Sequence, residues 1–227
     1  MIFTTSWDDG NKLDLKLSKI LLEHGIKGTF YIPISWKFRS LQDKEVKKLS
    51  KNFEIGSHSV SHSDLTKLPS RQLNHEILKS KKELEEIIRK EVNSFAYPFG
   101  KVNGKILDSV KAHYLFARTA KELQTDFPTD LLNCGFSVSI TNRPRRMFVS
   151  SGVFGLRNGF RWDKIARKLF LAAMKNDGVF HLQGHSWEIE KEKNWDKLID
   201  FFDFISKFDD VMFIDNGGLA NQQSNTL

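Results

Sequence analysis

The chain contains one cysteine, Cys134, in 227 residues, so an intrachain disulfide is excluded. No apolar run approaches the roughly 20 residues of a membrane-spanning helix, and neither a low-complexity linker nor an internal repeat is visible. The amino terminus lacks the charged segment, the long apolar segment and the small-residue cleavage site of a secretory signal. We therefore expect a cytoplasmic protein without a membrane span.

The chain is basic but has no recognised nucleic-acid motif. Its formal net charge is +7 and its pI is about 9.4, a balance that can favour nucleic acid, a membrane surface or an anionic substrate. The lysines are spread along expected helices, and the densest basic cluster is Arg143, Arg145 and Arg146 beside Pro144. We interpret the charge as a solvated surface and expect no nucleic-acid partner.

Short apolar runs alternate with amphipathic segments along most of the chain. The expected strands are Ile2–Ser6, Gly28–Pro33, Phe53–Ser57, Ser94–Tyr97, Tyr114–Arg118, Val179–Gln183 and Val211–Ile214. Repeated strand–helix units predict parallel strands, in an open doubly wound sheet or in a distorted barrel. The length fits one domain over residues 1–219, followed by a disordered polar tail at 220–227.

The string Trp7-Asp8-Asp9-Gly10 places two carboxylates directly after the first expected strand. Neighbouring strand residues point to opposite faces, so both carboxylates reach one site only where the strand ends and the chain turns. Gly10 supplies that turn. Taken alone, the string is better explained as an ordinary Asp-Gly turn.

The string His58-Ser-Val-Ser-His62 follows the third expected strand and carries two imidazoles four residues apart. On one helical turn, two histidines at this spacing can bind the same ion, and the small serines leave room for them. Two histidines and one carboxylate form a metal site with open positions, and the second carboxylate remains for proton transfer. Surface histidines are the alternative for this string alone, whereas the two strings together indicate a metal-dependent hydrolase.

Two further strings follow later strands. In Tyr97–Gly100 the proline and glycine favour a tight turn that could aim the Phe99 N–H into a pocket as an oxyanion donor. His185 follows the strand Val179–Gln183 and is a candidate general acid, whereas His181 within that strand is better explained as a packed or supporting imidazole. All four strings lie at the carboxyl ends of expected strands, where the sites of parallel α/β folds assemble.

With these motifs the chain resembles the polysaccharide deacetylase family, also called the NodB-homology or family 4 carbohydrate esterases. The resemblance extends over about residues 2–219. The segments that carry it are Trp7–Gly10 for the first motif, His58–His62 for the second, Tyr97–Gly100 for the later part of the third, Leu182–His185 for the fifth and Phe213–Gly217 for the final strand.

The resemblance implies an α/β fold, a distorted (β/α) barrel of about seven parallel strands, and one divalent metal, most often zinc and otherwise cobalt or nickel. By position it implies metal ligation by Asp9, His58 and His62, a general base at Asp8, an oxyanion donor at the Phe99 N–H and a general acid at His185. The expected reaction is hydrolysis of the C–N bond of an acetamido group on a sugar.

The chain departs from the family pattern at two places. Ala96 stands where the third motif usually carries an arginine that orients the base. We hypothesise that Arg118, at the end of the next expected strand, takes over this role; a surface arginine is the alternative. The fourth motif has no convincing match, and Arg161–Asp163 is only a faint echo of it.

The substrate stays open at this point. Trp36, Trp187 and Pro98 are candidate substrate contacts, although core packing is the alternative for both tryptophans. Relatives of this fold also open cyclic amides or remove formyl groups, so a small-molecule substrate is an alternative to a carbohydrate. A non-catalytic carbohydrate-binding protein is a further alternative, and the complete set of acid, base and ligands argues against it.

Overall fold

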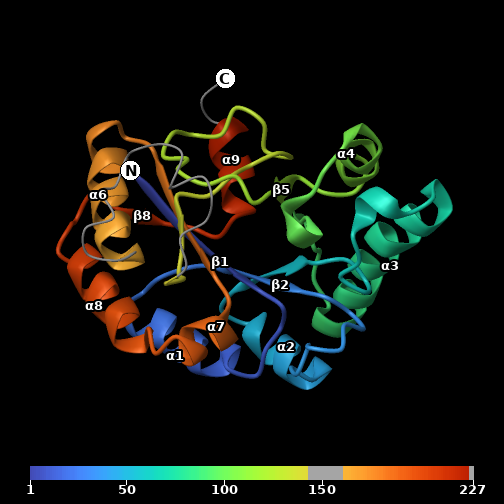
Figure 1. Ribbon diagram of the computed structural model, residues 1–227, viewed down its shortest axis with the longest axis horizontal. Helices are drawn as coiled ribbons and strands as arrows, with labels where there is room; N and C mark the ends of the chain where they lie inside the picture. The colour runs from blue at the N-terminus through green and yellow to red at the C-terminus, as the bar shows by residue number, and fades with distance from the viewer. Residues whose placement is uncertain (143–160, 225–227) are drawn as a thin grey trace.

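Parallel strands form the centre of the molecule. The computed structural model describes residues 1–142 and 161–224, and Arg143, Arg145 and Arg146 lie outside them. The strands are β1 (Ile2–Asp8), β2 (Thr29–Ile32), β3 (Glu54–Ser57), β4 (Ser94–Ala96), β5 (Phe116–Arg118), β6 (Val138–Ser139), β7 (Val179–Gly184) and β8 (Met212–Phe213). Seven follow one another in the order β5-β4-β3-β2-β1-β7-β6, and β8 adds to β1. The curled parallel sheet confirms the predicted distorted barrel (Figure 1).

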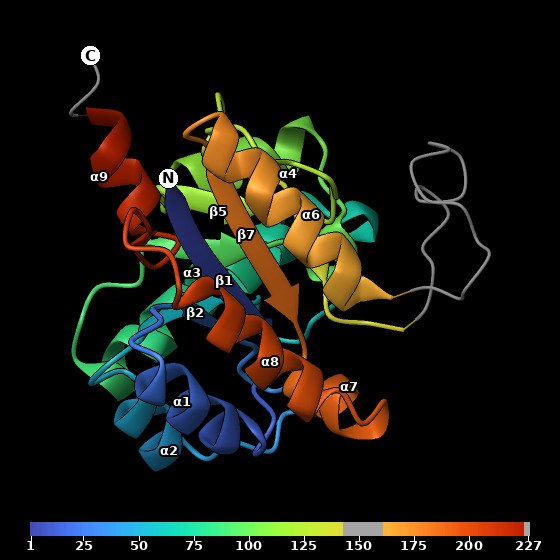
Figure 2. The same ribbon diagram turned by 90° about the vertical axis from the view of Figure 1, so that its left-hand side faces the viewer.

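Helices cover the outside of the sheet, as Figures 1 and 2 show from two sides. They are α1 (Asp14–Glu23), α2 (Asp43–Leu49), α3 (Ser70–Ile88), α4 (Gly104–Lys111), α6 (Trp162–Lys175), α7 (Ser186–Lys191), α8 (Trp195–Ile205) and α9 (Gly218–Ser224). No helix within residues 1–142 and 161–224 is both long enough and apolar enough to cross a membrane.

The sequence pattern explains where the helices begin and end. In α3 the apolar residues at helical spacing, Leu73, Ile77, Leu84 and Ile88, are all buried. The helix ends at Ile88, because Arg89 adopts a left-handed conformation with a φ of 59°.

The central strand β1 is buried from Phe3 to Asp8 and is paired with neighbouring strands on both edges. It pairs with β7 from Ile2 onward, with β2 near its carboxyl end and with β8 at its start. Phe3 stacks on Phe180 with ring centroids 5.5 Å apart and contacts Phe213 edge-on. Such burial on both faces is typical of parallel strands in α/β proteins.

No ladder joins β5 to β6 among the described strands, and the chain between them fills this side. Ala117 donates its N–H to the Leu131 carbonyl, and Arg118 forms an isolated parallel bridge with Cys134. Farther along, Phe136 donates to the carbonyl of Lys121. No strand pattern is visible in the sequence here, because these pairings are single bonds without strand periodicity.

The end of the chain differs from the disordered tail predicted at 220–227. Residues Gly218–Ser224 form α9, and residues 225–227 lie outside the described part. The Asp215 carboxylate accepts the N–H of Gly218 at 2.8 Å, and Leu219 is 2% exposed. One buried leucine and one capping carboxylate are enough to start this polar helix on the body of the protein.

A buried carboxyl joins the first turns of α1 and α7. Asp14 is 0% exposed, its Oδ1 accepts the Ser186 hydroxyl at 2.5 Å, and its Oδ2 has no hydrogen-bond partner among the described residues. Burial raises the pKa of Asp14 to about 8, and the nearby Asp9 carboxylate acts in the same direction. At neutral pH this side chain is therefore an uncharged acid.

The protonated Asp14 makes folding stability depend on pH in a defined direction. Its folded pKa of about 8 exceeds its ordinary value of 3.8, so its stabilising contribution is complete at low pH and is lost as the pH rises toward 8. We expect metal-free wild type to lose up to about 1.4 kcal/mol of unfolding free energy per pH unit from this group. Asp14→Asn, which imitates the neutral acid, should show a flatter urea-unfolding profile between pH 5 and 8. Parallel profiles for the two proteins would contradict the assignment.

Candidate active site

The carboxyl ends of β1, β3, β4, β5 and β7 surround one cavity of about 380 Å³. It is lined by Asp8, Asp9, Trp36, His58, His62, Tyr97, Phe99, Gly100, Arg118, Ala120, Phe136, Gln183 and His185. The sequence placed four separate strings at strand ends, and the structure brings all four to the same pocket.

Asp9, His58 and His62 form a cluster that could hold a metal ion, with one potential ligand atom of each within 4.8 Å of the others. Asp9 Oδ1 lies 4.0 Å from His58 Nε2 and 3.8 Å from His62 Nε2. Donors bound to one ion at about 2.1 Å lie about 4 Å apart or less, so these atoms fit one ion after small movements.

The protonation of the two histidines also suits a metal. Burial lowers the pKa of His58 to about 4 and lowers that of His62, so both imidazoles are neutral at pH 7. Nδ1 of His58 lies 2.7 Å from the Ala96 carbonyl oxygen. Because that oxygen can only accept a hydrogen bond, Nδ1 carries the proton and donates it in this bond. This contact leaves Nε2 of His58 as a lone-pair donor facing Asp9.

The two histidines come together through a turn, which corrects the predicted helical one. The residues after β3 are not helical, and both Ser59 and His62 have positive φ angles, of 65° and 54°. The Ser59 hydroxyl accepts the His62 N–H at 3.0 Å and closes the turn. Asp9 is also left-handed, with a φ of 83°. Strained backbone of this kind gathers at functional sites, where the surrounding structure holds it.

Aromatic rings hold the His62 side chain on two sides. The Trp36 ring stacks on the imidazole at 4.4 Å with an interplanar angle of 22°, and the Phe99 ring meets it edge-on at 4.8 Å. Nδ1 of His62 has no hydrogen-bond partner in the described part of the chain. Ring packing therefore orients this imidazole, whereas a carbonyl orients His58.

Asp8 forms a buried ion pair with Arg118. Nη2 of Arg118 donates to both carboxylate oxygens, at 2.7 and 2.5 Å, and the two residues are 4% and 3% exposed. Burial alone would raise the pKa of Asp8, but the charge and hydrogen bonds of Arg118, together with His58 and His185, hold that pKa well below its usual range. Asp8 is therefore a fixed carboxylate at neutral pH.

The ladder register shows how Arg118 reaches the position left open by Ala96. The two residues are direct partners in the parallel pairing of β4 with β5. Side chains paired across adjacent strands share one face of a sheet, so an arginine on β5 can reach the same carboxylate. The faint echo of the fourth motif lies elsewhere: Arg161 pairs with its neighbour Asp163 at 2.7 Å.

His185 lies between the carboxylate pair and a third acid. Its Nε2 is 3.8 Å from Asp8 and 3.8 Å from Asp9, and its Nδ1 is 3.3 Å from Glu188 Oε2. Burial lowers the pKa of His185, but Glu188 and the two aspartates together raise it above its usual value. The imidazolium form is thereby favoured, as a proton donor requires.

Sequence reasoning missed Gln183 and Glu188. The Gln183 amide donates to Asp8 Oδ2 at 3.2 Å, and its oxygen accepts the Ser139 hydroxyl at 2.7 Å. Gln183 could have been found from the alternation of side chains along β7. Every second residue of a strand faces the same side, so Gln183 faces the side of His185, two residues later. Glu188 offered no such signal, because α7 was not expected.

Of the three candidate substrate contacts, Trp36 and Trp187 lie at the site, whereas Pro98 does not line the cavity in the described part of the chain. Trp36 lines the cavity, and the 36%-exposed Trp187 donates its indole N–H to Asp9 Oδ2 at 2.9 Å. Pro98 is buried at the start of a 3-10 turn, Pro98–Gly100, and is not among the described residues that line the cavity. Phe99 has a φ of 58° and its ring is 60% exposed.

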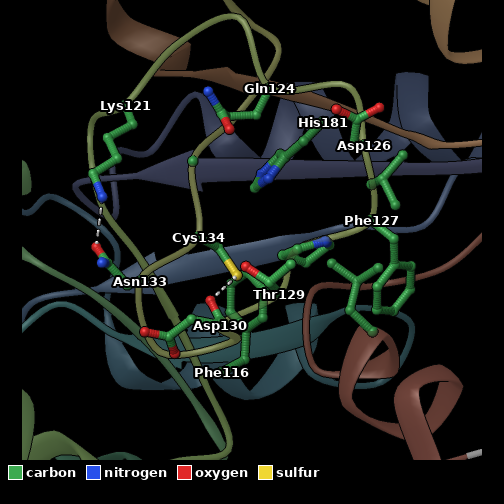
Figure 3. Close-up of a pocket in the computed structure, with 14 residues that line it drawn as sticks. Phe116, Lys121, Gln124, Asp126, Phe127, Thr129, Asp130, Asn133, Cys134 and His181 are labelled. Atoms are coloured by element: carbon green, nitrogen blue, oxygen red, sulfur yellow. Dashed lines mark hydrogen bonds between the residues drawn. The ribbon is translucent and has the colours of Figure 1, made fainter.

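His181 is a core histidine, as the sequence suggested. It is 3% exposed, and its Nε2 lies 2.8 Å from the Ser6 hydroxyl. Figure 3 shows it at the wall of a second cavity, of about 330 Å³, next to Cys134 and Phe116. This cavity includes the starts of β5 and β7, whereas the candidate site lies at their carboxyl ends.

The family is identified by a match over residues 2–115 to the polysaccharide deacetylase family. The chain belongs to this family. Within the match lie the Asp8-Asp9 pair, both candidate metal histidines and the Tyr97–Gly100 turn.

Relatives of known sequence and structure agree with this family. The chain is 30% identical over 108 residues to the uncharacterized protein YlxY of Bacillus subtilis (strain 168), a match that covers 47% of this chain and 33% of that protein. A Mycobacterium smegmatis protein described as a polysaccharide deacetylase superposes with a TM-score of 0.76 at 14% identity, over 100% of this chain and 91% of that one. A family 4 acetyl xylan esterase from Clostridium thermocellum, solved with a cobalt ion, gives 0.64 at 16% identity over 99% and 92%. At these identities the two structures show the shared fold.

Removing one histidine of the cluster should abolish metal binding. We expect His58→Ala to retain no zinc or cobalt after reconstitution and dialysis, because a carboxylate and one imidazole hold such ions weakly. His75→Ala, at an exposed position on α3, is the matched control and should keep wild-type metal content. Elemental analysis of both variants measures the difference, and full occupancy in His58→Ala would contradict the assignment.

Proposed function

We propose that the protein is a metal-dependent N-deacetylase that hydrolyses the acetamido C–N bond of an N-acetylated sugar or carbohydrate. One observation carries the proposal: an ion-paired carboxylate, Asp8, lies beside a cluster of Asp9, His58 and His62 suited to a metal. Acid, base and ligands thus meet in one pocket. Membership of the deacetylase family supports the reaction class.

Asp9, His58 and His62 would hold one divalent ion, for which we propose zinc, with cobalt or nickel as alternatives. The donor set of two neutral imidazoles and one carboxylate suits such ions and leaves coordination positions open. When bound, the ion supplies a Lewis acid that polarises a carbonyl and acidifies water. Proton transfer and stabilisation of the oxyanion are assigned to side chains and one backbone N–H of the protein itself.

Asp8 acts as the general base. Arg118 and Gln183 hold its two oxygens, so its remaining lone pairs have a fixed direction toward the cavity. A positioned carboxylate accepts the proton of the attacking water as the C–O bond forms. Fixing the base before substrate arrives removes reorientation from the reaction step.

His185 acts as the general acid. The amine leaves only when its nitrogen gains a proton, and the raised pKa of His185 keeps that proton available. The Phe99 N–H, on the turn Pro98–Gly100, is the proposed donor to the oxyanion. A donor of this type contributes about 3 kcal/mol to transition-state stabilisation.

Trp36 and Trp187 are the proposed sugar contacts, and Pro98 supports the wall by fixing the turn. Both indoles lie at the site, Trp36 in the cavity lining and Trp187 against Asp9. A hydrolysis screen with metal-reconstituted protein tests the proposal. It should include N-acetylglucosamine, chitooligosaccharides, nucleotide-linked N-acetyl sugars and cyclic ureides, with acetate release as the expected signal. Turnover of ureides alone would replace the deacetylase with a cyclic amidase.

Exchanging the base should separate metal binding from turnover. We expect Asp8→Asn to lower kcat by about 10²–10⁴-fold, the usual contribution of general base catalysis, while metal content stays at the wild-type level. Acetate-release kinetics and elemental analysis on one preparation measure both. Full activity of Asp8→Asn would assign the base elsewhere.

Exchanging Arg118 tests whether it orients the base. Arg118→Lys keeps the buried charge, which limits unfolding, but it lacks the planar guanidinium that donates to Asp8 through Nη2 while Nη1 donates to the Thr119 carbonyl. We expect kcat to fall at least tenfold with little change in KM, because Asp8 loses its fixed direction. Arg167→Lys on α6 is the control and should leave kcat unchanged. An unchanged kcat in Arg118→Lys would show that the pair serves folding alone.

A further inference from the structure

The two carboxylate oxygens of Asp9 have different partners. Oδ1 faces the imidazoles, at 4.0 Å from His58 Nε2 and 3.8 Å from His62 Nε2. Oδ2 accepts the indole N–H of Trp187 at 2.9 Å. The carboxylate is therefore already oriented, with one oxygen turned toward the histidines and the other engaged by an indole.

The fold brings Trp187 to this position through the junction of β7 and α7. His185 caps α7, and Trp187 is the second residue of the helix. The Ser186 hydroxyl between them donates to the buried Asp14, which anchors the first turn of α7 to α1. Trp187 therefore lies in a helical turn that is anchored to α1, and this turn fixes where its indole begins.

We propose that Trp187 is a positioning residue that restricts Asp9 to one-oxygen coordination of the metal. The inference rests on the proposed metal site and deepens it. A hydrogen bond between an N–H and a carboxylate is charge-assisted, so it opposes rotation of Oδ2 toward the ion. A ligand that offers one atom leaves more coordination positions for substrate and water than a ligand that offers two.

The need for such a contact follows from the local backbone. Asp9 has a φ of 83°, so the strand geometry of β1 does not direct its side chain. His58 has its own outer contact, from Nδ1 to the Ala96 carbonyl at 2.7 Å. Outer hydrogen bonds of this kind commonly change metal affinity by 10–100-fold, and Trp187 provides the corresponding contact for the carboxylate.

Trp187→Phe tests the inference, because it keeps an aromatic ring and removes only the N–H donor. We expect its Kd for Zn²⁺, measured by competition with a chromophoric chelator, to rise 10–100-fold. We also expect the visible spectrum of the Co²⁺-loaded variant to weaken and shift to shorter wavelength, as coordination number increases. A destabilised but otherwise intact site would not change this spectrum at saturating Co²⁺.

Two further variants make the test specific. Trp195→Phe removes an indole N–H that donates to Glu190, and it should keep the wild-type Kd and spectrum. Trp187→Leu should match Trp187→Phe in metal affinity and show a higher KM, because it also loses the ring. An unchanged Kd and Co²⁺ spectrum in Trp187→Phe would overturn the inference, while acetate release by the wild type would still support the proposed function. Failure of the wild type to bind metal would overturn both.

Discussion

The buried ion pair between Asp8 and Arg118 is the interaction on which the site depends. It joins the central strand β1 to β5, which lies at one end of the strand order, across the inside of the sheet. Both charges are more than nine-tenths buried, so each needs the other to offset its desolvation. Because β5 has no ladder to β6 among the described residues, this pair is a side-chain link from β5, at one end of the strand order, to the central strand.

Because Arg118 pairs with Asp8, the two adjacent aspartates have different surroundings and suit different roles. Asp8 ends β1 and faces Arg118, whereas Asp9 begins the turn and faces the histidines. Each carboxylate has hydrogen-bond donors of its own: Arg118 and Gln183 for Asp8, and Trp187 for Asp9. Environment rather than residue type thus separates a group suited to proton transfer from a group suited to a metal.

Much of this arrangement could be predicted from the sequence, and the limits have physical causes. Strand ends were predictable from apolar runs, so the residues that follow them were found. The residues that contact these site residues were not predictable. Ser139, which contacts Gln183, lies on a strand of only two residues, and Glu188, which contacts His185, lies on a helix that the sequence did not predict. The turn from His58 to His62 was mistaken for a helix, since four-residue spacing looks the same in both and only left-handed backbone distinguishes them.

Arg118 shows why a departure from a family motif need not remove the positive charge that the motif usually supplies. A Coulomb interaction depends on where the charge lies, and not on which strand carries it. Ala96 and Arg118 are ladder partners, so moving a guanidinium from one to the other shifts its attachment by one strand spacing of about 4.8 Å. An arginine side chain is long enough to span that difference and still bring one guanidinium nitrogen, Nη2, to Asp8. The register between β4 and β5 therefore places a positive charge at Asp8, the proposed base, although the motif that usually supplies this charge is incomplete.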